Sequence, residues 1–409
     1  MANVITPVDV YTVVNAMAQS MFGANTSIQA VNSSTFASVG EAMLRNGYEN
    51  TLNALGMQVA RTLFAVRPYS GKFGLINQID AEYGAILRKI SYFYDPTEAS
   101  TDWNTNLDSD QLNDGNSIDH YKIRKRYPLE ISFSGIKVLQ KSFTRFRKQL
   151  KIAFRSEEEF ANYYSGLMVE IANEIRIIQE SENRLLVLNH IGALYNTGTA
   201  RMKVNLTEGY NTKFGTSYTS AQLRTTYLKE FLAYMVSTIK YTSDLLEEAS
   251  AAFHLTPKKY KDDGTTQLQL LRHTPKSLQR LFLLRPLMLD AEAQVLPEIF
   301  NDEYLRIENY EGVNFWQDIG DPGAISITPN QFNVANGQSA TGTAVTAPYI
   351  VGLLFDRDAL ATNYKIDDVV TTPVNAAGDY YNTFYHWCKN YLDDFTENSV
   401  LFYMEDAGE

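Results

Sequence analysis

The chain has 409 residues, 44% of which are hydrophobic, and its formal net charge is -11. This length and composition suggest two or three compact regions with a sizeable core, and they exclude a chain that is disordered over most of its length. The acidic balance argues against a protein that coats nucleic acid, which would be basic. The single cysteine, Cys388, excludes an intrachain disulfide and fits a reducing cytoplasm.

Residues 1–45 are polar and rich in Asn, Ser, Thr and Ala. A short helix could begin at Pro7, but the segment holds too little apolar material to fold alone. We therefore expect an extended N-terminal arm that docks on another part of the structure. Residues 41–67 are predicted to form an amphipathic helix, broken by Gly47 and Gly56, and then a strand at Thr62–Val66.

The sharpest charge asymmetry lies between residues 95 and 155. Asp95–Asp119 holds seven acidic residues and no Lys or Arg, whereas Lys122–Arg155 is basic and contains Glu130 as its only acid. A long polar excursion between two strand-like flanks predicts a projecting β-hairpin. Three interpretations of the basic block stay open: a solvated face, a DNA-facing patch, or a surface that pairs with the acidic loop of a neighbouring subunit.

The best helix begins at Ser156, where serine can cap free amides and the glutamates at 157–159 favour the positive end of the helix. Apolar residues then recur at spacings of three and four, namely Phe160, Tyr164, Leu167, Met168, Ile171, Ile175 and Ile178. The pattern predicts one helix running to about Leu194. At 1.5 Å per residue it would be about 55 Å long, which is typical of a helix that forms the spine of a domain.

The rest of the chain predicts a mixed α/β region followed by aromatic strands. The expected elements are a crossover at 199–218, a helix within 220–254, a strand at Leu278–Leu289 with Pro286 at an edge or bend, a turn-rich β insertion at 321–348, an apolar strand at Ile350–Phe355, an aromatic segment at 380–387 and a strand at Ser399–Met404.

The search for catalytic chemistry finds no phosphate-binding glycine loop, nucleophile elbow or metal-binding histidine spacing. His386 and Cys388 would share a strand face, but no third group is near to orient them, so a small buried thiol is the preferred interpretation. Asp356 and Asp358 are interpreted as residues of a strand-to-turn junction rather than as an acid/base pair, because Asp favours turns. We expect no enzyme, cofactor, metal site or membrane span.

Three stretches carry a family resemblance. They are NSSTFASVGEA at 32–42, IAFRSEEEFANYYSGLMVEIANEI at 152–175, and VGLLFDRDALATNYKI with YYNTFYHWCKNYLDDFTENSVLFY between 351 and 403. Together with the order of the predicted elements, they resemble the Hong Kong 97 fold of tailed-phage major capsid proteins. The likeness is strongest to the head proteins of small podophages such as phi-29 and its relatives.

The resemblance implies an α+β fold with four parts. These are an N-terminal arm at 1–45; a peripheral domain at 46–64, 131–198 and 366–409 with the spine helix at about 157–194; an extended β-hairpin loop at 65–130; and an axial domain at 199–365 with its β-rich insertion at about 321–348.

The implied function is that of a structural subunit of an icosahedral phage head. Copies would assemble in the host cytoplasm into hexamers and pentamers, with a separate scaffolding protein and a portal protein, and the virion shell would enclose double-stranded DNA by non-specific contact. Three alternatives stay open. They are an encapsulin-like nanocompartment, a tail or connector protein, and an enzyme that acts on a polysaccharide through residues 380–387 and the acids at 356 and 358.

We hypothesise that the acidic loop of one subunit lies over the basic segment of the next. The candidate contact residues are Asp102, Asp108, Asp110, Asp114, Arg124, Lys125 and Arg126. Exposed ion pairs are individually worth about 0–1 kcal/mol, so a network of them would set the register of the contact more than its strength.

Overall fold

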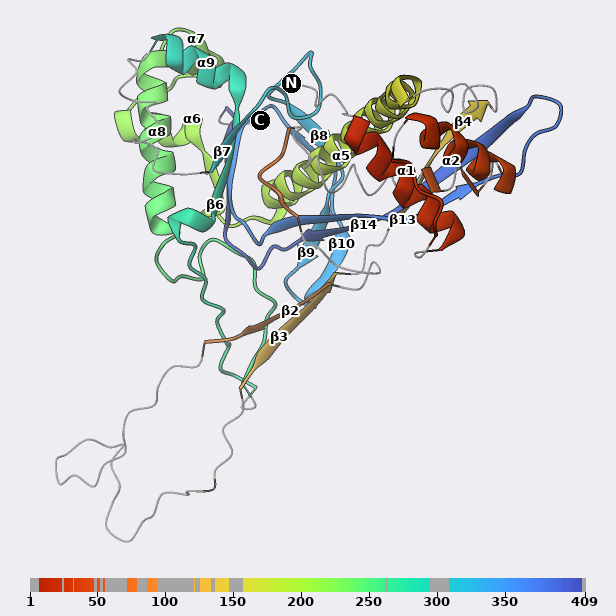
Figure 1. Ribbon diagram of the computed structural model, residues 1–409. Helices are drawn as coiled ribbons and strands as arrows, with labels where there is room; N and C mark the ends of the chain where they lie inside the picture. Colours follow the sequence, from red (N-terminus) through yellow and green to blue (C-terminus); the bar gives the residue numbers. More distant parts are fainter. Residues whose placement is uncertain are drawn as a thin grey trace. The chain divides into compact units, whose positions relative to one another are not determined.

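The computed structural model in Figure 1 divides into two compact units, each described by itself. Unit 1 comprises Met1–Ile86, Ser134–Val187 and Leu360–Asp393, and unit 2 comprises Leu87–Phe133, Leu188–Ala359 and Asp394–Glu409. Within these, the structure describes residues 7–23, 26–31, 33–47, 50–51, 54–55, 72–78, 87–94, 121, 126–133, 137–146, 157–261, 264–294 and 309–406.

Unit 1 contains a four-stranded sheet in the order β1-β13-β14-β4. The strands are β1 (Asn77–Gln78), β13 (Leu360–Thr371), β14 (Tyr380–Asp393) and β4 (Lys137–Phe146). The long antiparallel pairs β13–β14 and β14–β4 form its centre, and the short β1 adds a parallel edge. Thus the aromatic segment predicted at 380–387 belongs to a longer strand at the middle of this sheet.

The segment predicted as an extended arm folds into unit 1 as two helices, α1 (Pro7–Phe22) and α2 (Ser33–Asn46). Their apolar residues join one buried core with the first part of the long helix and with strands β4, β13 and β14. The side-chain amide of Asn15 fixes the connection, because Asn15 Nδ2 donates to Ala30 O and the Ala30 N–H donates to Asn15 Oδ1. The sequence analysis underestimated how much of this segment folds. Its few apolar residues are enough to hold two helices in place once they pack on a larger core.

The helix predicted over 41–67 is therefore wrong at its start, because α2 begins at Ser33. Helix α2 ends at Asn46, and Gly47 follows with a φ of 134°, a backbone conformation that favours glycine. The break predicted at Gly47 is thereby confirmed. Gly56 and the strand predicted at Thr62–Val66 lie outside the described residues.

The long helix is confirmed as α5 (Glu157–Thr197). Within unit 1, Phe160, Tyr164 and Ile171 are buried, at the spacing that the sequence pattern predicts. The helix ends at Thr197, close to the end predicted at about Leu194, and the Gly198 N–H donates to Leu194 O. The boundary between the two units falls inside this helix, after Val187.

Unit 2 is built on a five-stranded sheet in the order β5-β15-β12-β6-β7. The strands are β5 (Lys203–Asn205), β15 (Ser399–Met404), β12 (Tyr349–Asp356), β6 (Gln279–Leu284) and β7 (Tyr310–Val313). The middle strand β12 is antiparallel to both neighbours, while β5 and β7 are parallel edge strands. The apolar strand predicted at Ile350–Phe355 is thus confirmed, and its continuous apolar character follows from burial on both faces.

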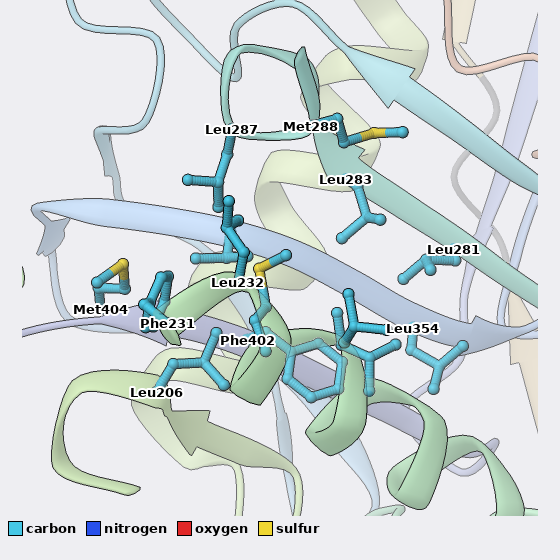
Figure 2. Close-up of a cluster of buried hydrophobic side chains, with 14 of the residues drawn as sticks. Leu206, Phe231, Leu232, Leu281, Leu283, Leu287, Met288, Leu354, Phe402 and Met404 are labelled. Atoms are coloured by element: carbon cyan, nitrogen blue, oxygen red, sulfur yellow. The ribbon is translucent and has the colours of Figure 1, made fainter. Parts of the chain in front are cut away.

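Helices cover one face of this sheet and complete the unit 2 core (Figure 2). In Figure 2, Phe231 and Leu232 of α8 (Leu228–Leu245) lie in one buried cluster with Phe402 of β15 and Leu354 of β12. Burial of each such side chain contributes about 1.5–3 kcal/mol to the stability of the fold. Besides the last part of α5, from Leu188 onward, the described helices of this unit are α6 (Leu206–Phe214), α7 (Ser220–Thr225), α8 (Leu228–Leu245), α9 (Arg285–Gln294) and the short η2 (Lys276–Leu278).

Three sequence-based expectations about unit 2 differ from the structure. The crossover expected at 199–218 contains β5 and α6. The strand expected at Leu278–Leu289 ends at Leu284, and Pro286, expected at an edge or bend, lies in the first turn of α9, where the missing N–H of proline costs nothing. The C-terminal strand β15, which the resemblance groups with residues 131–198, pairs with β12 and β5 in unit 2. Pairing partners so distant in sequence leave no local signal.

The β-rich insertion contains two small antiparallel pairs. Strand β8 (Ile325–Ile327) pairs with β11 (Val345–Ala347), and β9 (Asn330–Asn333) pairs with β10 (Gln338–Thr341). The prediction of a turn-rich β insertion at 321–348 is confirmed in its secondary structure.

Candidate functional site

The base of the predicted loop is a two-stranded antiparallel hairpin in unit 2. Strand β2 (Leu87–Tyr92) pairs with β3 (Pro128–Phe133), so that Leu87 lies opposite Phe133 and Tyr92 opposite Pro128. The Phe93 N–H continues the pairing by donating to Tyr127 O. Both ends of the acidic segment between the strands are therefore held together.

An apolar contact attaches this hairpin base to the rest of unit 2. Phe93 is buried against Leu268 and Leu270, with Tyr127 and Leu129 packed beside them. The Tyr94 N–H also donates to the Gln269 carbonyl. The opposite side of the hairpin is exposed, because burial alternates along both strands.

A buried ion cluster fixes the hairpin on its inner side, and it consists of Lys89, Arg272, Asp394 and Glu397. Lys89 Nζ lies 2.7 Å from Asp394 Oδ2 and 2.6 Å from Glu397 Oε1. Arg272 Nη2 lies 3.1 Å from the same Glu397 oxygen. The side chains of Asp394 and Glu397 are 1% and 10% exposed, so two cations balance two anions out of contact with most of the solvent.

Additional hydrogen bonds hold Arg272 and Asp394 of the ion cluster in place. Arg272 Nη2 donates to Ser91 Oγ on β2, and Arg272 Nε donates to Thr396 O. Asp394 Oδ1 accepts from both the N–H and the hydroxyl of Thr396. The cluster thus connects β2 directly to the turn that precedes the C-terminal strand.

Burial and the charges of the ion cluster shift the pKa values of Lys89, Glu397 and the nearby His254. Although burial by itself lowers the pKa of Lys89, the charges of Asp394 and Glu397 outweigh this effect and raise the pKa above its ordinary value. Burial raises the pKa of Glu397, against the opposing charges of Lys89 and Arg272. Nearby, burial lowers the pKa of His254, whose ring lies within hydrogen-bond distance of Asn398 Oδ1 and Leu270 O.

Of the predicted contact residues, Arg126 lies in the described part of the chain, where it is exposed just before β3. Asp102, Asp108, Asp110, Asp114, Arg124 and Lys125 lie outside the described residues. The hypothesis of a contact between subunits therefore stays a prediction.

Sequence reasoning missed the ion cluster. The two acids, Asp394 and Glu397, stand three residues apart in the C-terminal stretch that carried the family resemblance, which was the available signal. Their partner Lys89 lies about three hundred residues earlier, and no local pattern predicts that pairing.

The junction after β12 is a turn, as predicted. Asp356 is buried, and its Oδ1 accepts from the Asp358 N–H while its Oδ2 accepts from the Thr274 hydroxyl. The partly exposed Asp358 pairs instead with the neighbouring Arg357. The two carboxylates have different structural partners, which is typical of a turn and not of an acid/base pair.

We expect the two aspartates to differ in their effect on stability. Asp356→Ala should lower the free energy of unfolding by about 2 kcal/mol, because it leaves buried donors without an acceptor. Asp358→Ala should change it by less than about 1 kcal/mol, since its ion pair is exposed to solvent. Urea denaturation of the purified subunit measures both values. Equal losses would show that Asp356 does not hold the turn.

His386 and Cys388 lie on β14 opposite Gln140 and Val138 of β4. Cys388 is half-buried, so the thiol is less buried than the preferred interpretation expects. Across the described residues, no three His, Cys, Asp or Glu side chains gather in a way that could hold a metal ion. No helix in the described part of the chain is long and apolar enough to cross a membrane.

Comparison with solved structures shows which fold the chain has. The capsid structure of Staphylococcus phage Andhra matches with a TM-score of 0.50 at 10% identity, covering 84% of this chain and 86% of that chain. A structure of the head fiber and inner core protein gp22 of native bacteriophage P68 matches with a TM-score of 0.48 at 11% identity, covering 83% of this chain and 89% of that chain. The chain has the mixed α+β fold of Hong Kong 97-like phage capsid proteins.

The family follows from the sequence itself. A sequence profile of the Phi29-like phage major capsid protein matches residues 14–403, and the chain belongs to this family. It is a structural protein of the virion that forms the shell of a phage head, and the predicted resemblance is confirmed. None of the curated proteins matches the chain.

Proposed function

We propose that copies of this capsid protein form the hexamers and pentamers of an icosahedral head around double-stranded DNA. Unit 1, with the first part of α5, would be the peripheral domain, and residues 199–359 of unit 2 would form the axial domain near the centre of each capsomer. A separate scaffolding protein and a portal protein would assist assembly. The net charge of -11 supports a wall that contains DNA without binding it tightly.

One observation carries the proposal for the loop. The β2–β3 ladder joins the two ends of the segment that contains all the acids from Asp102 to Asp114, and the exposed Arg126 lies two residues before β3 begins. Opposite charges on one hairpin can pair between identical neighbours arranged in a ring, since each copy supplies one loop and receives another.

Charge reversal tests this contact. The variant with Arg124→Glu, Lys125→Glu and Arg126→Glu should fold normally but fail to close shells, because the acidic loop of each neighbour is then repelled. Electron microscopy and sedimentation of assembly reactions with scaffolding protein measure the yield of closed shells, and circular dichroism checks the fold.

The matched control adds Asp108→Lys, Asp110→Lys and Asp114→Lys to the first variant, which restores opposite charges with the signs exchanged. We expect this six-residue variant to recover shell closure. Normal shells from the first variant, or no recovery in the second, would contradict the proposed pairing.

A further inference from the structure

Strand β10 presents an open edge in the described part of the chain. Its one partner there is β9, and all four of its residues, Gln338–Thr341, are exposed. The strand contains neither lysine nor proline, the residues with which natural proteins commonly protect a sheet edge. Figure 1 shows the two strands as a pair.

The hydrogen bonds of β9 determine which backbone groups of β10 point outward. Asn330 lies opposite Thr341, and its N–H donates to Asn189 Oδ1 while its carbonyl accepts from Asn189 Nδ2, at 2.7 and 3.1 Å. The backbone groups of Asn330 therefore point away from β10, which makes Asn330 and Thr341 a non-hydrogen-bonded pair. The Gly342 N–H, one residue later, donates to Pro329 O as the alternation requires.

It follows that the N–H and C=O groups of Thr341 also point away from β9. Since orientation alternates with a period of two, those of Ser339 do the same. Residues 339 and 341 lie symmetrically about Ala340. Two copies of β10 placed antiparallel about a twofold axis through Ala340 would therefore pair Ser339 of each copy with Thr341 of the other, through four backbone hydrogen bonds.

The charge pattern favours a second copy as the partner. Pro322–Phe355 contains no Asp, Glu, Lys, Arg or His, although charged residues make up 20% of the chain. Copies with a net charge of -11 repel one another, so a charge-free strand is a place where two of them can approach closely. At a twofold axis each residue lies near its own equivalent in the other copy. A charged residue at the centre of the contact would therefore face a like charge, which such a contact excludes.

We propose that β10 is a site of contact between two capsid subunits, in which the two β9–β10 pairs join into one four-stranded sheet about a twofold axis. The contact rests on the shell-forming role of the family and is independent of the pairing proposed for the acidic loop. Ala340 forms a non-hydrogen-bonded pair with its own equivalent, where Cα atoms lie about 4.5 Å apart, within the range of a disulfide.

Disulfide trapping tests the geometry. In a Cys388→Ser background, Ala340→Cys shells treated with copper phenanthroline as the oxidant should yield mostly covalent dimers on non-reducing gels. The control is Ala335→Cys, an exposed position in the turn of the same hairpin, which should remain mostly monomeric. Intact shells that yield no more dimer from Ala340→Cys than from Ala335→Cys would overturn the β10 contact while leaving the shell function unaffected.

A charge exchange provides an independent readout through the yield of shells. Ser339→Lys with Thr341→Lys places like charges opposite each other and should reduce the yield at least tenfold. Ser339→Lys with Thr341→Glu places a lysine opposite a glutamate of the other copy and should restore it. Equal yields from the two double variants would overturn the antiparallel register, even if the cysteine variant did not assemble.

Discussion

Replacement of Lys89 by methionine is expected to lower the free energy of unfolding by about 3 kcal/mol, because it leaves a buried Asp394 without its cation. Methionine retains the length of the lysine stem, so the loss reports the charge and not a cavity. Arg272 still pairs with Glu397, which keeps the loss near the lower end of the range for a broken buried pair. Chemical denaturation of the unassembled subunit measures the change.

The neighbouring residue supplies the control. Arg88 pairs with Glu130 across the same hairpin, but both side chains are largely exposed, so Arg88→Met should cost less than about 1 kcal/mol. Hydrogen exchange should show faster exchange of the β2 and β3 amides in Lys89→Met, with the amides of the β12–β15 pair unchanged. A loss no larger than that of Arg88→Met would mean that the ion cluster does not anchor the hairpin.

The cost of Lys89→Met should also depend on pH. Burial already raises the folded-state pKa of Glu397 above its ordinary value, and removal of the Lys89 charge raises this pKa further. A carboxyl with a raised folded-state pKa destabilises the fold at pH values where it must be ionised, and this cost disappears as it becomes protonated. The difference in the free energy of unfolding between Lys89→Met and the natural protein should therefore shrink as the pH falls from 7 toward the ordinary pKa of a glutamate.

Replacement of Gly352 by alanine should lower the free energy of unfolding by about 3 kcal/mol, although alanine ordinarily stabilises a strand relative to glycine. Gly352 lies in the middle strand β12, opposite Leu283 of β6. A Cβ atom there would lie 2.6 Å from Phe282 O and 2.7 Å from Leu283 Cδ2. The first of these is a backbone atom of the neighbouring strand, which can yield only if the sheet shifts.

Gly312 in β7 of the same sheet is the matched control. A Cβ atom at Gly312 would meet the Arg285 side chain at 3.5 Å, an ordinary contact, so Gly312→Ala should change the free energy of unfolding by less than about 1 kcal/mol, in the stabilising direction. Thermal and urea unfolding of both variants measure the difference. Equal stability of the two alanine variants would show that the β6–β12 pair tolerates the added methyl group.

The assembly surfaces were only partly predictable. The strand-like flanks of the acidic segment predicted the hairpin, and its β2–β3 base is present. The anchoring ion cluster could not be predicted, because it joins residues from three distant stretches of the chain. The open edge of β10 was also missed: the sequence predicts a turn-rich insertion at 321–348, but only the contact of Asn330 with Asn189 shows which backbone groups point outward.

Local sequence patterns are sufficient to predict the elements whose periodicity is strong. The apolar spacing from Phe160 onward predicts α5, the continuous apolar run at Ile350–Phe355 predicts β12, and Asp356 marks the turn that follows. The family likewise follows from residues spread along nearly the whole chain. Such elements can be recognised in the sequence because helix and strand patterns repeat within a few residues.

The partners of these elements follow from long-range packing and not from local sequence. In the folded chain, Pro7–Phe22 and Ser33–Asn46 join unit 1 as helices, β15 joins the sheet of unit 2, and Lys89 lies beside Asp394. The physical reason is that a weakly apolar segment or a lone charge gains most of its stability from the surface or counter-charge that it meets after folding. That partner is distant in sequence, so no local pattern records it.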